Sequence, residues 1–378
     1  MADALSVRPL SVDEHLAYVA TRATVSFLQT PAWARVKTDW TAESLGWVDA
    51  TGSVRGAGLV LYRQVPRLRR YLAYLPEGPD LPWAEAAATG RLDAWLAPLR
   101  DYLTSKGAFA IRLGPPVALR SWDAPTLKSA LAGDGATRLG DLTPTWQDSD
   151  AMLIPQQLRA AGWIPPAQAQ GFATGQPQYV FWLPLAGRTE EQVFAGFNQL
   201  WRRNVRRAEK MGVQVSLGGR DDLAAFHALY VLTAERDGFT PRPLSYFTGM
   251  WDAMAAEDGQ RLRLYLATHE GELVAATTMV QVGSHAWYSY GASSTAKRDV
   301  RGSNAVQWRM ITDALAGGAE VYDLRGITDT LDPDDSHVGL IQFKLGTGGQ
   351  AVEYPGEWTL PLNKLLYRGF ELYLERRG

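Results

Sequence analysis

The chain has 378 residues, of which 46% are hydrophobic and 21% charged, and its formal net charge is −2. It contains no cysteine, which excludes disulfides, thiolate catalysis and cysteine-ligated zinc or iron–sulfur sites. No window approaches roughly 18 consecutive apolar residues, and the N-terminal stretch lacks the apolar core of a signal peptide. We therefore expect a cytoplasmic protein, and the length favours two domains.

The first third of the chain predicts a mixture of helices and strands. Helices are expected over residues 11–22, 30–41 and 84–107, and a hairpin over 43–65. Ser11 is a candidate N-cap because Glu14 follows three residues later, and Pro31 suits a first helical turn. The hairpin rests on alternating apolar residues around a Thr-Gly turn.

A segment rich in Gly, Pro, Asp and Gln, residues 126–178, predicts a loop region with a domain border near 150–180. Beyond it, strands are expected over 178–185, 212–218, 262–293 and 320–327, and helices over 193–211, 221–238, 244–257 and 304–319. The sequence pattern predicts mostly antiparallel strands mixed with helices. This indicates an α+β fold and not a regular βαβ alternation. Neither a P-loop nor a strand-linked G-x-G-x-x-G is present.

The helix WRRNVRRAEKMGV carries five basic residues in a chain that is slightly acidic overall. At about 100° per residue they fall within an arc of roughly 140°, opposite an apolar face. These residues are Arg202, Arg203, Arg206, Arg207 and Lys210. Such a stripe is either a solvated face or a phosphate-binding face, and arginine is well suited to phosphate. The run alone does not distinguish RNA, a nucleotide diphosphate or an anionic lipid head group.

Five segments, in this order, carry a resemblance to one known family: FLQTPAWARVKTDW, WRRNVRRAEKMGV, RDGFTPRPLSYF, WYSYGASS and GLIQFKLGTGG. Together they resemble the Fem family, the aminoacyl-tRNA-dependent transferases that build peptidoglycan interpeptide bridges. The chain departs from the family at Gly114-Pro115, where an Asp-Pro is common, and at Leu345 and Gly346 in the closing motif.

The resemblance implies two GNAT-like (N-acyltransferase) domains packed side by side, without the coiled-coil arm of some members. We expect the first domain over residues 1–150, with 345–378 returning to it, and the second over 151–344. The implied reaction moves an amino acid from aminoacyl-tRNA onto the side-chain amine of a stem peptide. The acceptor is UDP-MurNAc-pentapeptide or a lipid-linked precursor, and we expect no cofactor, no metal and a monomer. Peripheral contact with the inner face of the membrane stays open.

The same resemblance assigns roles to individual residues. Lys344 would place its amine near the oxyanion, and Phe343 would shape the pocket for the tRNA end. The basic stripe would contact tRNA. The acceptor would be bound by Lys37, Arg242, Tyr246, Tyr288 and Tyr290. Tyr288 and Tyr290 are two apart on a predicted strand and so should share one sheet face.

Several questions remain open at this level. Arg242 and Tyr246 share a helical face if the helix has begun, but Pro241 and Pro243 make a loop equally compatible with the sequence. Asp323 or Asp329 could act as a base. One rival function is an acyl-CoA-dependent GNAT enzyme, for which RDVRGSNAVQW is a near match to the pyrophosphate loop. The other is a non-catalytic RNA- or phospholipid-binding protein. The amino acid transferred is not specified by the sequence.

Overall fold

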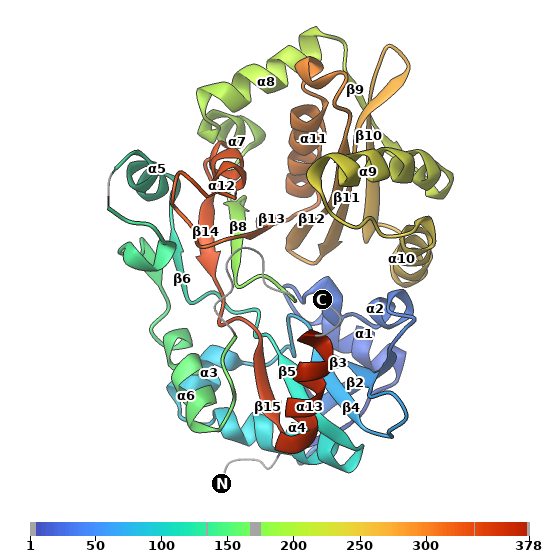
Figure 1. Cartoon of the computed structure of the whole chain (residues 1–378), viewed down its shortest axis with the longest axis vertical. Helices are drawn as coiled ribbons and strands as arrows, with labels where there is room; N and C mark the ends of the chain where they lie inside the picture. The colour runs from blue at the N-terminus through green and yellow to red at the C-terminus, as the bar shows by residue number, and fades with distance from the viewer. Residues whose placement is uncertain (1–4, 134, 167–174, 336, 376–378) are drawn as a thin grey trace. The chain divides into compact units, whose positions relative to one another are not determined.

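The computed structural model describes residues 5–133, 135–166, 175–335 and 337–375 (Figure 1). The chain forms two compact units. The first comprises Met1–Ser121, Pro144–Tyr179 and Val352–Gly378, and the second Trp122–Thr143 and Val180–Ala351. Compared with the expected boundaries, the first unit extends beyond residue 150 to Tyr179, the C-terminal return begins at Val352, and Trp122–Thr143 packs with the second unit.

The first unit holds strands β1 (Ser6–Pro9), β2 (Thr41–Val48), β3 (Val54–Gln64), β4 (Tyr71–Leu75), β5 (Ala108–Leu113) and β15 (Trp358–Pro361). Its helices are α1 (Val12–Ala20), α2 (Pro31–Val36), α3 (Trp83–Ala88), α4 (Leu92–Ser105), α6 (Ile154–Ala160) and α13 (Lys364–Glu375). The strand order is β1-β2-β3-β4-β5-β15, and only the β4–β5 pair is parallel. The short strands β6 (Arg120–Trp122) and β7 (Trp146–Gln147) pair antiparallel.

Local sequence explains several of these boundaries. Ser11 and Glu14 form the expected capping box at the start of α1. The helix expected over 84–107 is two helices, because the chain turns at Gly90, whose φ is +64°. Leu92, Leu96, Leu99 and Leu103 follow helical spacing along α4 and are buried in the core of the first unit. Phe370 of α13 packs on Phe109 of β5 with ring centroids 5.2 Å apart.

The second unit holds strands β8 (Tyr179–Pro184), β9 (Gln214–Gly218), β10 (Leu262–His269), β11 (Glu272–Val282), β12 (His285–Ser293), β13 (Val321–Ile327) and β14 (Gln350–Glu353). Its helices are α5 (Ala124–Ala132), α7 (Glu190–Gly196), α8 (Gln199–Lys210), α9 (Leu223–Asp237), α10 (Leu244–Glu257), α11 (Gly302–Ala316) and α12 (Val338–Leu345). The strands run in the order β14-β8-β13-β12-β11-β10-β9. Strands β9, β10, β11 and β12 pair antiparallel with one another, and β12 pairs parallel with β13.

Helices cover both faces of this second sheet (Figure 1). Ala276 of β11 belongs to a core cluster with Phe226 of α9 and Phe247 of α10. The next residue, Thr277, points to the other face, where its hydroxyl donates to the sulfur of Met310 in α11 at 2.9 Å. Between β9 and α9 the chain has only Gly219 and a single 3-10 turn, all of it described, so no helical arm is inserted there.

Candidate active site

The basic helix α8 begins and ends where its sequence indicates. The side chain of Asn198 caps it by accepting from the Trp201 amide at 2.8 Å. The chain leaves the helix through Gly212, whose φ is +80°. Trp201, Val205 and Ala208 are buried on one face, against which α11 packs. The amphipathic helix predicted from the charge pattern is therefore confirmed.

The five cations of α8 divide into two rows. Arg202 donates to the Ala195 carbonyl at 2.7 Å, and the guanidinium of Arg206 lies 5.4 Å from the centre of the Phe194 ring. Both therefore lean toward α7. Arg203, Arg207 and Lys210 are exposed on the other side.

Arg207 has an acidic neighbour that the helix sequence does not reveal. Its Nε donates to the Asp299 carbonyl at 2.8 Å, and its charge pairs with the Asp299 carboxylate at 3.7 Å. Both side chains of this pair are largely exposed. Such a pair is worth about 0–1 kcal/mol, so Arg207 can exchange it for another anion.

Lys344 lies in α12 and is 5% exposed. Its Nζ donates to the carbonyls of Arg325 and Gly326 in β13, at 3.1 and 2.7 Å. Burial lowers the pKa of Lys344 to about 7, against which the nearby carboxylate of Asp323 acts to raise it. An amine of this kind is present in both protonation states near neutral pH, which is typical of groups that take part in proton transfer or charge stabilisation.

Asp323 organises the backbone that receives Lys344. Its Oδ1 accepts from the Arg325 amide at 2.5 Å, and its Oδ2 lies 3.4 Å from Nε2 of His285. Arg325 is held at a φ of +65°, in the left-handed region. Burial raises the pKa of Asp323, but the hydrogen bond from His285 and the charge of Arg325 outweigh it and keep that pKa below its ordinary value.

The carboxylate of Asp323 thereby shapes a turn whose carbonyls bind the amine of Lys344. The sequence named Asp323 only as one of two candidate bases. The other, Asp329, forms an ion pair with Arg138 at 3.0 Å on a partly exposed surface. His285 was not singled out. Its ring stacks on Trp287 with centroids 4.2 Å apart, which holds it beside Asp323.

Phe343 and the basic helix meet directly. Phe343 is 41% exposed, and its ring centroid lies 5.0 Å from that of Trp201 in α8. The Trp201 indole donates to the Phe343 carbonyl at 2.9 Å. Gly346 permits this contact, because a Cβ there would come within 2.1 Å of the Trp201 ring. The glycine that departs from the family pattern is thus required by packing.

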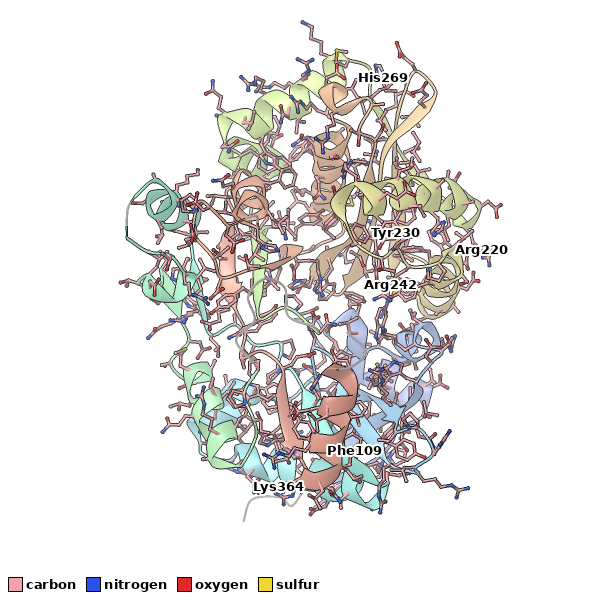
Figure 2. The ribbon with its side chains drawn as sticks, in the orientation of Figure 1. Phe109, Arg220, Tyr230, Arg242, His269 and Lys364 are labelled. Atoms are coloured by element: carbon pink, nitrogen blue, oxygen red, sulfur yellow. The ribbon has the colours of Figure 1, made fainter. Side chains whose placement is uncertain are left out.

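Three of the expected acceptor-binding residues form a cluster. Arg242 lies in the loop before α10, which begins at Leu244, so the alternative of a shared helical face does not apply. Its guanidinium nevertheless lies over the Tyr246 ring at 4.6 Å, and the hydroxyls of Tyr246 and Tyr290 are 3.0 Å apart. Figure 2 labels Arg242 beside Tyr230, whose ring also contacts that of Tyr290. Burial, then the neighbouring Tyr290, raises the pKa of Tyr246, which stays neutral.

Tyr288 does not share the sheet face of Tyr290, and that expectation is wrong. The register of β12 against β11 shifts so that Met279 opposes Tyr288 while Thr278 opposes Tyr290. Because Thr278 and Met279 are consecutive, they point to opposite faces, and so do their partners. The Tyr288 hydroxyl lies over Gly291, and burial raises the pKa of Tyr288 to about 12.

Lys37 follows α2 in the first unit, and its Nζ lies 5.6 Å from the centre of the Trp33 ring. The remaining sequence feature, Gly302 at the start of α11, has a packing explanation. A Cβ there would lie 2.8 Å from Val274 of β11, so glycine lets the helix approach the sheet. This accounts for the glycine that had suggested an acyl-CoA loop.

In the described part of the chain, no set of three or more histidine, aspartate or glutamate side chains is arranged to hold a metal ion. None of the described helices combines the length and the apolar character that a membrane crossing requires.

Comparison with known proteins places these features in a family. The chain is 25% identical over 428 residues to a lipid II:glycine glycyltransferase of Staphylococcus haemolyticus (strain JCSC1435), covering 95% of this chain and 93% of that one. Its fold is similar to that of the FemX crystal structure, with a TM-score of 0.78, 24% identity and coverage of 96% and 99%. A tandem GNAT protein from the clavulanic acid biosynthesis pathway gives a TM-score of 0.50, 13% identity and coverage of 95% and 98%.

The likeness to FemX and to the tandem protein shows that each of the two units has the GNAT-like fold expected from the sequence. The family model described as FemAB matches residues 10–270 and 260–374, which is most of the chain. These two stretches contain all five motifs quoted from the sequence. The chain belongs to the FemAB family.

Proposed function

We propose that this protein transfers an amino acid from aminoacyl-tRNA onto an amine of the stem peptide of a lipid-linked peptidoglycan precursor, building an interpeptide bridge. Family membership and relatives named as lipid II:glycine glycyltransferases support this reaction class. Those names also favour the lipid-linked acceptor over the soluble UDP-linked one, and glycine as the first amino acid to test.

One observation supports the proposal independently of the family: the cationic helix α8 is in direct contact with the Phe343-Lys344 segment of α12. Trp201 of α8 contacts the Phe343 ring and donates to its carbonyl. A phosphate chain held by the exposed arginines of α8 would therefore end near the residues expected to act on its esterified terminus. Arginine is well suited to hold such a chain, because its planar fork matches phosphate oxygens.

The reaction requires little beyond correct positioning of the aminoacyl ester and the acceptor amine. The neutral amine attacks the ester carbonyl and a tetrahedral oxyanion forms. The carbon–oxygen bond to the ribose then breaks as the attacking nitrogen loses a proton and the leaving oxygen gains one. A protonated lysine has three N–H donors. Two of those on Lys344 are used by the Arg325 and Gly326 carbonyls, which leaves one for the oxyanion or the leaving oxygen.

The acceptor would be bound by the remaining predicted residues. Arg242, placed by the aromatic ring of Tyr246, supplies charge for a phosphate, and Tyr246 and Tyr290 supply hydroxyls. Lys37 lies in the first unit, and the family resemblance alone assigns it to the acceptor. Tyr288, on the opposite face of β12 from Tyr290, would contact a different part of the substrate.

A lipid-linked acceptor also calls for contact with a membrane surface. Leu365 and Leu372 are 84% and 55% exposed on α13, seven residues apart and so on one helical face. We assign the peripheral contact to this face. Flotation with anionic vesicles should recover less of an L365S/L372S variant than of the unaltered protein, whereas equal recovery would remove α13 from this role.

The function is tested by incubating the protein with individually charged tRNAs and with either the lipid-linked or the UDP-linked precursor. Mass spectrometry should detect a product heavier than the acceptor by one amino-acid residue. Uncharged tRNA with free amino acid should give none. Acetyl transfer from acetyl-CoA in place of aminoacyl transfer would support the acyl-CoA function, and binding of RNA without any product would support a non-catalytic role.

A further inference from the structure

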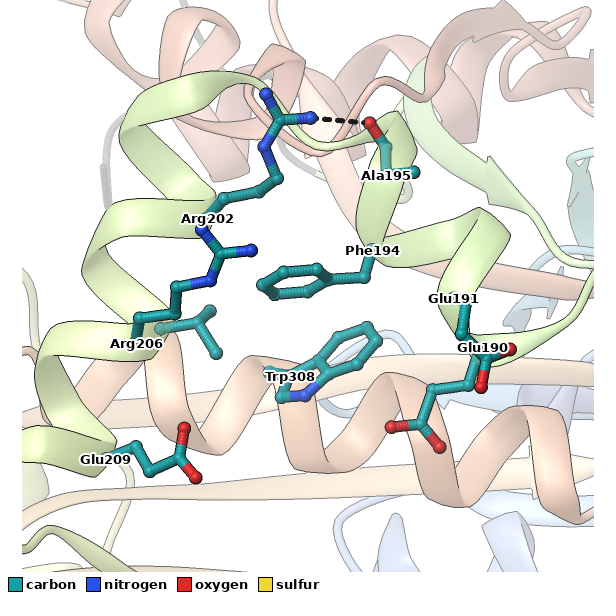
Figure 3. Close-up of a pocket in the computed structure, with 9 residues that line it drawn as sticks. Glu190, Glu191, Phe194, Ala195, Arg202, Arg206, Glu209 and Trp308 are labelled. Carbon is teal, nitrogen blue, oxygen red and sulfur yellow. Dashed lines mark hydrogen bonds between the residues drawn. The ribbon is translucent and has the colours of Figure 1, made fainter.

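An open pocket of about 510 Å³ lies between α7, α8 and α11 (Figure 3). This volume falls in the range of about 300–1,000 Å³ typical of small-ligand sites. The aromatic side chains of Phe194 and Trp308, with ring centroids 5.1 Å apart, form its floor. Both rings are only partly buried, so the pocket offers flat apolar surface to a ligand.

Charge is segregated around this floor. Arg202 and Arg206 line the wall formed by α8, and Glu190 and Glu191 line the wall formed by the first turn of α7 (Figure 3). Glu209 adds a third carboxylate at the far end of α8. Three acids against two bases make the pocket unfavourable for an anion alone. They favour a ligand that brings a phosphate to one wall and hydrogen-bond donors to the other.

A nucleotide has these properties. Its base stacks on aromatic rings, and its phosphate pairs with arginine. An ionised carboxylate only accepts hydrogen bonds. A hydrogen bond from the Thr189 side chain, followed by one from the backbone amide of Glu191, holds the pKa of Glu191 below its ordinary value. The acidic wall therefore favours bases with an exocyclic amino group, adenine, cytosine or guanine, over uracil.

We propose that this pocket holds one unpaired base from the 3′ end of the donor RNA and selects a base that carries an exocyclic amino group. The inference rests on the proposed function, in which tRNA is the donor, and it adds a base-reading site to a helix otherwise expected to contact phosphates. All three residues of the common CCA terminus of tRNA carry such an amino group.

An RNA strand fits the surroundings better than a free nucleotide. From Arg202 to Lys210, α8 rises about 12 Å, and Arg203, Arg207 and Lys210 lie outside the pocket along this length. A single nucleotide would engage only the cations in the pocket, whereas a strand would also engage this outer row. A chain of ring contacts also connects the pocket to Phe343: the Phe194 ring contacts Phe197, Phe197 contacts Trp201, and Trp201 contacts Phe343.

The test compares two RNA hairpins that differ only in an unpaired 3′ end, CCA or UUU, by fluorescence anisotropy at fixed salt. The unaltered protein should bind the CCA hairpin more tightly. Trp308→Leu should weaken CCA binding by about tenfold, the scale of one lost base–aromatic stack. The double variant E190Q/E191Q should reduce the preference for CCA, because a glutamine amide can also donate to uracil.

Controls separate the base site from general attraction to phosphate. Arg207→Gln should weaken both hairpins equally, since it removes a charge outside the pocket. Trp308→Phe retains an aromatic face and should retain most of the affinity if the Leu variant is folded but weak. Circular dichroism and thermal unfolding check the folding of each variant.

Three outcomes would overturn the inference: equal affinity of the unaltered protein for both hairpins, unchanged CCA binding in a folded Trp308→Leu variant, or displacement of the hairpin by free CMP or AMP at matched concentrations. Failure of the proposed function would be a different result, namely no aminoacyl transfer by the unaltered protein. If transfer occurs with a tRNA ending in CCA but the pocket variants leave its KM unchanged, only the base site is refuted.

Discussion

Each unit contains a run of antiparallel strands and a parallel pair, β4–β5 in the first and β12–β13 in the second, but the two pairs end differently. In the first unit β4 and β5 stay paired to the last residue of both strands, Leu75 and Leu113. In the second, β12 and β13 are paired only up to Trp287 and Asp323, although both strands continue. Lys344 binds the carbonyls of β13 just beyond that point.

The two units also differ in the buried ionisable group that each contains. In the first unit Glu357 accepts from the Tyr74 hydroxyl, and burial raises the pKa of its carboxyl group. In the second unit burial lowers the pKa of an amine. The two units thus differ in the buried ionisable group that each holds: a carboxyl group bound to a tyrosine hydroxyl in the first, and an amine bound to backbone carbonyls of β13 in the second.

The largest effect should come from removing the amine of the second unit. Lys344→Met should lower turnover on the order of tenfold or more, about 1.4 kcal/mol of activation free energy per tenfold, because the oxyanion loses a donor. Single-turnover transfer from aminoacyl-tRNA measures it. Glu357→Gln is the matched change in the first unit and should leave turnover near the unaltered value. An equal loss of turnover in both variants would show that the two buried groups do not differ in function.

Asp323→Asn should lower turnover several-fold through Lys344. The amide oxygen can still accept from Arg325, but the charge that favours the Lys344 ammonium is gone. Residues acting through one another show non-additive effects, so Asp323→Asn should cause little further loss in the Lys344→Met background. Additive losses would mean that Asp323 acts separately, for example as a base.

Charge reversal on α8 should raise the KM for aminoacyl-tRNA and leave the fold intact. Arg206→Glu with Arg207→Glu replaces attraction to phosphates by repulsion, and the effect should grow as salt is lowered. The first unit provides a matched control in Arg67→Glu with Arg69→Glu, two exposed arginines of the β3–β4 loop. A KM that rises equally for both pairs would show non-specific attraction only.

The pKa of Lys344 also predicts a pH dependence of stability. The unfolded lysine binds its proton up to its ordinary value of 10.5, whereas the folded one releases it near 7. Between these values the unfolded state binds more protons, so the free energy of unfolding should rise with pH. Urea unfolding from pH 7 to pH 10 measures this slope, and Lys344→Met should flatten it. An unchanged slope would show that Lys344 is charged when folded.

The last effect is on stability and not on turnover, and it concerns the contact between α8 and α12. Gly346→Ala would place a Cβ within 2.1 Å of Trp201 and should cost about 1–3 kcal/mol of stability. Gly339 lies in the same helix with no atom within 4 Å of its Cβ position. Gly339→Ala should therefore be neutral or stabilising by up to about 1 kcal/mol. Thermal unfolding compares the two, and equal behaviour would refute the packing explanation.

Sequence alone was sufficient for the α+β class, the amphipathic α8, its C-terminal glycine and the family, because these depend on local periodicity and on motif order. It also named Phe343, Lys344 and the cluster of Arg242, Tyr246 and Tyr290, although contact with substrate stays a prediction. Residues close in sequence keep their relation in the fold unless an insertion disturbs it, as the bulge in β12 does for Tyr288.

Only the tertiary structure decided which groups surround these residues. Four features of the site join separate segments of the chain. They are the Arg325 and Gly326 carbonyls around Lys344, the pairing of Asp323 with His285, the contact of Trp201 with Phe343, and the pocket over Phe194 and Trp308. The pKa of Lys344 likewise follows from burial, which no local pattern encodes. Local sequence dictates helices and strands, whereas desolvation and long-range contacts, which give the site its chemistry, exist only once those elements pack.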